Sequence, residues 1–248
     1  MIKDKRILLL FSGIVVLFSY VTLQHGNEIN EYIFSMMMVV PLAIASYLSF
    51  YLSRKYKKVP KFCLGHILLG LSMAFYVMAE VSWIVFGEFG MDQYPSFVDV
   101  LYTLYMLFAL LHPISILRFF GARLKKIHYG IISGTVIITL IIYTLYAEPL
   151  EGIETWLMGF HFVGIASTTL GVILVTTILL KNRQVFPFWV LIGIAFVVNI
   201  LSDLHYYSAE NWSDWQQSDW VNVLWFTSTM IIIYALLQHR RMYHVLKS

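Results

Sequence analysis

The chain has 248 residues, of which 59% are hydrophobic and 12% are charged, and its formal net charge is +3. Soluble domains carry about 25% charged residues, so this composition excludes a soluble globule, a disordered chain and a nucleic-acid binder. The length fits a single transmembrane domain over residues 1–248. The one cysteine, Cys63, excludes an internal disulfide.

Eight apolar segments follow one another along the chain, and each is long enough to cross a bilayer. A crossing needs about 20 helical residues, and the backbone in lipid must satisfy its own hydrogen bonds. We therefore expect an all-α, polytopic membrane protein with eight transmembrane helices. The expected spans are residues 7–23, 33–53, 63–87, 97–119, 127–146, 157–180, 186–208 and 220–238.

The basic residues indicate the orientation of these spans. All 17 Lys and Arg residues fall at the N-terminus, in the second, fourth and sixth connections, or in the tail. The remaining connections carry acidic residues instead. Because Lys and Arg are retained on the cytoplasmic side, we expect a multi-pass protein of the cell membrane, surrounded by lipid, with both termini in the cytoplasm.

An internal repeat appears when the chain is shifted on itself by 123 residues. Glu80 then aligns with Asp203, and the segment Val98–Tyr102 aligns with Val221–Trp225 without a gap. We expect two tandem four-helix repeats, residues 1–123 and 124–248. Each repeat has an even number of spans, so the two should share one orientation, as parallel repeats do.

Ionisable side chains inside the spans are the candidates for function, because they are costly in lipid. Most of them cluster toward the outer ends of the helices, beside aromatic residues that suit an apolar or cationic ligand. We expect an outward-facing acidic and aromatic pocket that takes a small-molecule ligand from the outer side. Its expected residues are Glu80, Trp83, Tyr94, Asp99, His161, Asp203, His205 and Tyr206.

Some of these residues also have a structural interpretation. Glu80 is also explained as a protonated carboxyl that bonds to a neighbouring helix. Ser96 and Asp99 have the spacing of a helix N-cap and the third residue of that helix. Capping and ligand binding are therefore equally good explanations of Asp99. Asp203 and His205 are two residues apart on one helix and therefore point in different directions.

Three classes of function stay open: a ligand-binding sensor, an intramembrane metal-dependent hydrolase and a transmembrane b-haem redox protein. A hydrolase would draw zinc ligands from His161, His205, Glu80 and Asp203. A haem protein would use the inner pair His66 and His112 together with the outer pair His161 and His205. The sequence favours the sensor over an enzyme, and it leaves the cofactor unknown.

The segment from Asp92 to Tyr102, read as Asp-Gln-Tyr-Pro-Ser-Phe-Val-Asp-Val-Leu-Tyr, resembles a motif of multi-pass sensor modules in bacteria and archaea. Those modules carry approximately Asp-Pro-Tyr-Pro-Ser-x-Ala-Asp-x-x-Tyr and often precede diguanylate cyclases, phosphodiesterases or histidine kinases. Gln93 and Val98 depart from this pattern. The resemblance implies a membrane signal-input module. No output domain follows the last span, so we expect a stand-alone module with a cytoplasmic or membrane signalling partner.

Overall fold

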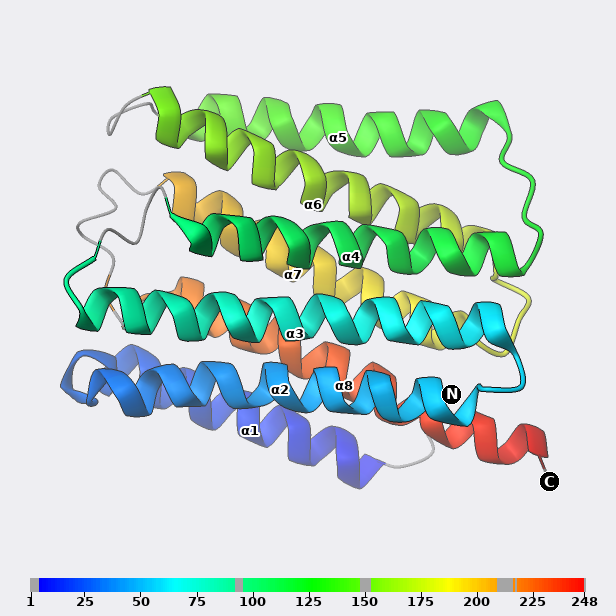
Figure 1. The fold of residues 1–248 in the computed structure, drawn as a ribbon, viewed down its shortest axis with the longest axis horizontal. Helices are drawn as coiled ribbons and strands as arrows, with labels where there is room; N and C mark the ends of the chain where they lie inside the picture. Colours follow the sequence, from blue (N-terminus) through cyan, green and yellow to red (C-terminus); the bar gives the residue numbers. More distant parts are fainter. Residues whose placement is uncertain (1–4, 92–95, 148–152, 209–215, 217, 248) are drawn as a thin grey trace. The chain divides into compact units, whose positions relative to one another are not determined.

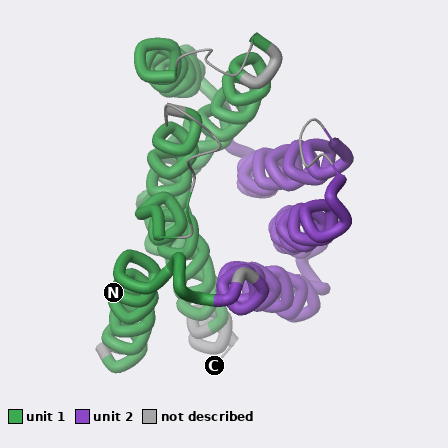
Figure 2. The backbone as a smooth tube through the Cα atoms, turned by 90° about the vertical axis from the view of Figure 1, so that its left-hand side faces the viewer, with its two compact units in different colours: residues 1–29, 124–248 green, residues 30–123 purple. Residues whose placement is uncertain are grey.

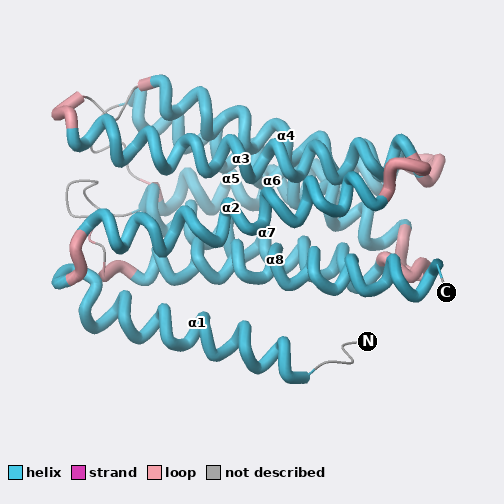
Figure 3. The backbone as a smooth tube through the Cα atoms, turned by 60° about the horizontal axis from the view of Figure 1, so that its bottom comes forward, coloured by secondary structure: helices cyan, strands magenta, loops and turns pink. Residues whose placement is uncertain are grey.

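A computed structural model of the chain describes residues 5–91, 96–147, 153–208, 216 and 218–247. In these residues the regular structure is entirely helical (Figures 1 and 3). The elements are α1 (Lys5–His25), the 3-10 helix η1 (Gly26–Glu28), α2 (Glu31–Lys55), α3 (Pro60–Glu88), α4 (Phe97–Phe119), α5 (Lys126–Tyr146), α6 (Ile153–Leu179), α7 (Phe186–Ser208) and α8 (Trp220–Lys247).

Eight helices in the described part are long and apolar enough to cross a membrane. Their order and positions confirm the expected spans. The last helix differs most, because α8 continues to Lys247, beyond the expected end at residue 238. Its final turns contain charged residues. Because hydropathy falls there, the sequence predicts that the span ends, although the helical backbone continues.

Local sequence explains where α4 begins. The Ser96 hydroxyl accepts a hydrogen bond from Val98 N at 3.1 Å, and Asp99 Oδ2 accepts one from Ser96 N at 2.7 Å. These two bonds form a capping box, which satisfies backbone N–H groups that have no partner within the helix. The capping interpretation of Asp99 is therefore confirmed.

The chain divides into two compact units, coloured separately in Figure 2. One unit, residues 30–123, contains α2, α3 and α4, with α3 packed against both neighbours. The other, residues 1–29 and 124–248, contains α1 and α5 to α8. The division after Arg123 coincides with the expected repeat boundary, whereas residues 1–29 group with the second half of the chain.

Glycines set the closest helix contacts within each unit. A Cβ built on Gly70 of α3 would lie 2.9 Å from the Phe50 ring of α2, and one on Gly65 would lie 2.7 Å from Ile116 of α4. Small residues let helix backbones approach closely in lipid, where association depends on van der Waals packing and hydrogen bonds. The unit of α2 to α4 is therefore tightly packed along α3.

Aromatic rings join α1 to α8 in the other unit. Phe18 stacks on Phe226 with ring centroids 3.8 Å apart, and Phe11 lies 5.6 Å from Tyr234. Much of the remaining surface of α1 is exposed and apolar, including Leu9 and Leu17. The contacts of α1 with α8 therefore lie on the helix face that carries Phe11 and Phe18.

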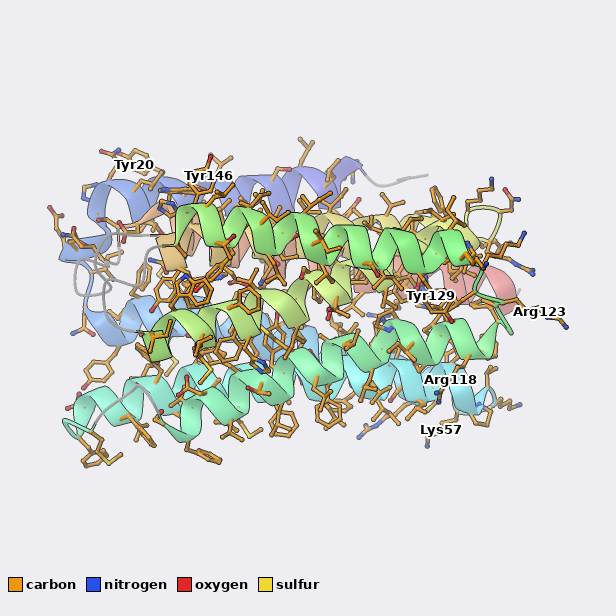
Figure 4. The ribbon with its side chains drawn as sticks, turned by 90° about the horizontal axis from the view of Figure 1, so that it is seen from above. Tyr20, Lys57, Arg118, Arg123, Tyr129 and Tyr146 are labelled. Carbon is orange, nitrogen blue, oxygen red and sulfur yellow. The ribbon has the colours of Figure 1, made fainter. Side chains whose placement is uncertain are left out.

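Basic side chains gather at one end of α2, α3 and α4. Arg54 and Lys55 lie in the last turn of α2, and Arg118 lies in the last turn of α4. Figure 4 shows Lys57, Arg118 and Arg123 at this same end. Because α3 runs away from it, starting at Pro60, Glu80 lies toward the opposite end of the unit.

Candidate functional site

Glu80 is the acidic residue at the centre of the candidate site in residues 30–123. The Tyr102 hydroxyl of α4 donates a hydrogen bond to Glu80 Oε1 at 2.9 Å. The Glu80 side chain is half-buried. A carboxyl in the last third of α3 is thus tied to the second turn of α4.

Aromatic rings of α3 and α4 pack close to Tyr102, the donor in this pair. Tyr102 packs against a buried cluster of Ala79, Val98 and Leu101, as do Phe75, Trp83 and Phe86. The Tyr76 ring lies 5.9 Å from that of Tyr102, and it stacks on Tyr105 with centroids 4.4 Å apart. Trp83, one of the expected residues, therefore packs against the same buried cluster as Tyr102, the donor to Glu80.

Asp203 of α7 occupies a more closed site in the other unit. Its Oδ1 accepts a hydrogen bond from Trp225 Nε1 at 2.9 Å, and its Oδ2 accepts one from Asn199 Nδ2 at 2.9 Å. Asp203 is buried, with 8% of its surface exposed. Both carboxyl oxygens are therefore engaged by neutral donors, one of them from α8.

The other expected residues of this unit have separate surroundings. The Tyr206 ring lies 5.3 Å from Trp225, which links it to the Asp203 site. The His205 ring packs on Trp220 at 4.2 Å instead, as expected from its direction on the helix. The side chain of His161 is exposed. Tyr94 lies outside the described residues, as do Asp92, Gln93 and Pro95 of the sensor-like motif.

The two acids occupy equivalent positions in their helix pairs. Glu80 bonds to the residue 22 positions later, Tyr102, and Asp203 bonds to the residue 22 positions later, Trp225. The first pair is carried onto the second by the offset of 123 residues. Each consists of a carboxyl on the first helix and an aromatic donor on the second.

Further contacts repeat at the same offset. The Ser72 hydroxyl donates to Tyr105 O at 3.0 Å, and at the equivalent positions the Ser228 hydroxyl donates to Ala195 O at 3.0 Å, so the donor has changed helix. Three other contacts have a counterpart at this offset. Gly70 lies against Phe50, as Gly193 lies against Ile173, and Gly65 lies against Ile116, as Phe188 lies against His239. Ala79 lies beside Val98, and at the equivalent positions Ser202 is bonded to Val221. The helices α2 to α4 and α6 to α8 thus pack in one register.

The two histidines expected near the basic end lie within one unit and are buried. His112 Nδ1 lies 2.8 Å from Gly65 O, and the His112 ring centroid lies 6.2 Å from that of His66. His66 also stacks on Tyr56 at 5.4 Å. Gly65 and Ile116 bring α3 and α4 close together beside these rings, so a porphyrin between them would have to separate the helices.

The zinc-ligand set expected for a hydrolase does not assemble within residues 124–248. His161 is exposed, His205 packs on Trp220, and Asp203 is bound by Trp225 and Asn199. Across the described residues, no group of three or more His, Cys, Asp and Glu side chains is placed to hold a metal ion.

Sequence reasoning identified the acids but missed the role of Tyr102 as the donor to Glu80. The available signal was the alignment of Tyr102 with Trp225, because both are aromatic residues that carry a hydrogen-bond donor. Comparisons with protein families, curated proteins and solved structures found no match to this chain. The resemblance to sensor modules therefore remains a prediction from the motif.

Proposed function

We propose that this chain is a ligand-binding membrane protein with a sensor role and that its ligand site is built around Glu80. The observation that carries the proposal is the repeated pairing of a carboxyl inside a span with an aromatic donor on the next helix. A carboxyl in a membrane is costly, and two of them are retained at equivalent positions. Packing alone would be served equally well by apolar residues.

The matching contacts also support duplication of the helical unit. Five pairs of positions make corresponding contacts at an offset of 123 residues, in two helix blocks that share little residue identity. We infer tandem repeats in which α2 to α4 correspond to α6 to α8. Since the offset spans four helices, the repeats have the same orientation in the membrane.

The basic ends of the helices support a cytoplasmic location for both termini. Positive residues remain on the cytoplasmic side, and Glu80 lies toward the opposite end of α3. On this orientation Glu80 lies in the outer half of its span. A small molecule outside the cell is then the ligand, and a cytoplasmic or membrane partner receives the signal.

Ligand-dependent stabilisation tests the proposal directly. Wild-type protein and the Glu80→Gln variant, purified in detergent, are heated with a panel of cationic, neutral and anionic small molecules. At least one compound should raise the melting temperature of the wild type, and Glu80→Gln should reduce that shift. If every effective compound stabilises both proteins equally, the Glu80 site is not the ligand site.

The same sample tests the two alternatives. An absorption spectrum from about 350 to 700 nm would reveal a Soret band if His66 and His112 hold haem. Elemental analysis would reveal stoichiometric zinc if the protein is a metal-dependent hydrolase. We expect neither signal, and either one would replace the sensor proposal.

A further inference from the structure

We propose that the ligand recognised at Glu80 is an organic ammonium ion, held by the carboxylate and by the aromatic rings around it. This inference rests on the proposed function, since it names the chemical class of ligand for the same site. It follows from the charges, hydrogen bonds and rings of residues 30–123 alone.

The first argument is the missing countercharge. No Lys or Arg occurs between Phe62 and Leu117, a segment that covers nearly all of α3 and α4. Lys57, Arg118 and Arg123 lie at one end of this unit (Figure 4). Glu80 lies toward the other end, because α3 starts near these basic residues and runs away from them. An ionised carboxyl within a span needs a compensating positive charge, and without one it takes up a proton. Since α3 and α4 supply no such charge, a bound cation is what would keep Glu80 ionised.

The second argument is the state of the two carboxyl oxygens. One oxygen of Glu80, Oε1, accepts a hydrogen bond from the Tyr102 hydroxyl. That bond fixes the carboxyl while the half-buried side chain keeps part of its surface accessible. At Asp203 both oxygens accept hydrogen bonds and the side chain is buried. Of the two acids, Glu80 is therefore the more exposed residue and has fewer hydrogen-bond donors on its carboxyl.

The third argument is the chemistry of the surrounding side chains. Trp83 and Tyr102 lie on the two helices that form the Glu80–Tyr102 pair, and both pack against one buried cluster. The faces of such rings attract cations. A metal cation would instead require several oxygen ligands. The described residues supply no group of three His, Cys, Asp or Glu side chains for one. One carboxylate beside aromatic rings matches an alkylammonium head group.

Matched cationic and neutral compounds test this inference on the wild-type protein. The cationic compounds are tetramethylammonium, choline and benzyltrimethylammonium. The neutral compound is 3,3-dimethylbutan-1-ol, which has the shape of choline with carbon in place of the charged nitrogen. We measure binding through the melting temperature and tryptophan fluorescence of protein in detergent. At least one ammonium ion should bind, and choline should bind about tenfold or more tightly than its neutral counterpart, a difference of about 1.4 kcal/mol.

Two variants assign the effect to the site. Glu80→Gln should weaken binding of the ammonium ion about tenfold or more, because the carboxylate is removed. Glu88→Gln is the matched control, since it removes an equal charge from the same helix at an exposed position, where the glutamine oxygen can still accept the hydrogen bond from the Tyr32 hydroxyl. It should leave the affinity within about twofold of the wild type, a difference under about 0.5 kcal/mol.

The outcomes separate this inference from the proposed function. Equal binding of choline and its neutral counterpart, or an equal loss in both variants, would overturn the ammonium assignment. If no ammonium ion binds while a neutral or anionic compound does so in a Glu80-dependent manner, the ligand class is wrong and the site is retained. If no compound of any class stabilises the wild type, both proposals fail. Comparison on the wild type does not depend on the folding of the variants.

Discussion

The Tyr102 hydroxyl donates a hydrogen bond to Glu80 Oε1 and so connects α4 to α3. The equivalent bond in the second half of the chain runs from Trp225 to Asp203. A hydrogen bond between helices in a membrane contributes about 0.6 kcal/mol on average and rarely more than about 1.7 kcal/mol. The bond therefore orients the carboxyl more than it stabilises the fold.

A double-mutant cycle measures this bond. Glu80→Leu, Tyr102→Phe and the double variant should show a coupling energy of about 0.6 kcal/mol in unfolding experiments in detergent, since leucine cannot accept the hydrogen bond. Tyr47→Phe is the control, because Tyr47 lies on α2 of the same unit with an exposed side chain. A coupling no larger than that between Glu80→Leu and Tyr47→Phe would contradict the bond.

Gly171 is predicted to be essential for packing α6 against α5. A Cβ at this position would lie 2.9 Å from the Cα atom of Ile132, and backbone cannot move aside as a flexible side chain can. Gly171→Ala should therefore lower the free energy of unfolding by about 1–3 kcal/mol.

Gly164→Ala is the matched control on the same helix. The nearest atom to its added Cβ is Leu140 Cδ2 at 3.9 Å, an ordinary contact distance. This variant should have stability equal to or slightly above that of the wild type, since alanine favours a helix. Equal destabilisation by the two substitutions would argue against the close contact of α6 with α5.

Phe18 is predicted to hold α1 against α8 through its stacked contact with Phe226. Phe18→Ala should destabilise the protein by about 1–3 kcal/mol, because dispersion contacts are lost while lipid keeps the helix out of water. Leu17→Ala provides the control, as Leu17 is 63% exposed. Unfolding and limited proteolysis of α1 would measure the difference, and similar behaviour of both variants would contradict this packing.

The orientation can be tested by cysteine labelling. Single cysteines at Lys57→Cys and Phe89→Cys, each in a Cys63→Ser background, mark the two ends of α3. A membrane-impermeant maleimide should label residue 89 in intact cells and residue 57 only after permeabilisation, as positive residues face the cytoplasm. The reverse pattern would place the Glu80 site on the cytoplasmic side.

The sequence alone determined the eight helices and the clustering of basic residues at helix ends, and it offered the capping of α4 by Ser96 and Asp99 as one of two interpretations. Apolar length decides a span because lipid offers no other partner to the backbone, and capping depends on residues three positions apart. Glu80 and Asp203 were likewise visible as the rare acids within spans. These features depend on composition and short-range spacing, which the sequence displays directly.

Only the tertiary structure decided how the helices use these residues. It paired Glu80 with Tyr102 and Asp203 with Trp225, left His161 exposed, and packed α1 against α8. Hydropathy cannot distinguish these outcomes, because lipid is as apolar as a neighbouring helix and both faces of a span have similar composition. Ring shape, close contacts at glycine and hydrogen-bond geometry decide which helices and side chains pair, and these features exist only in the folded structure.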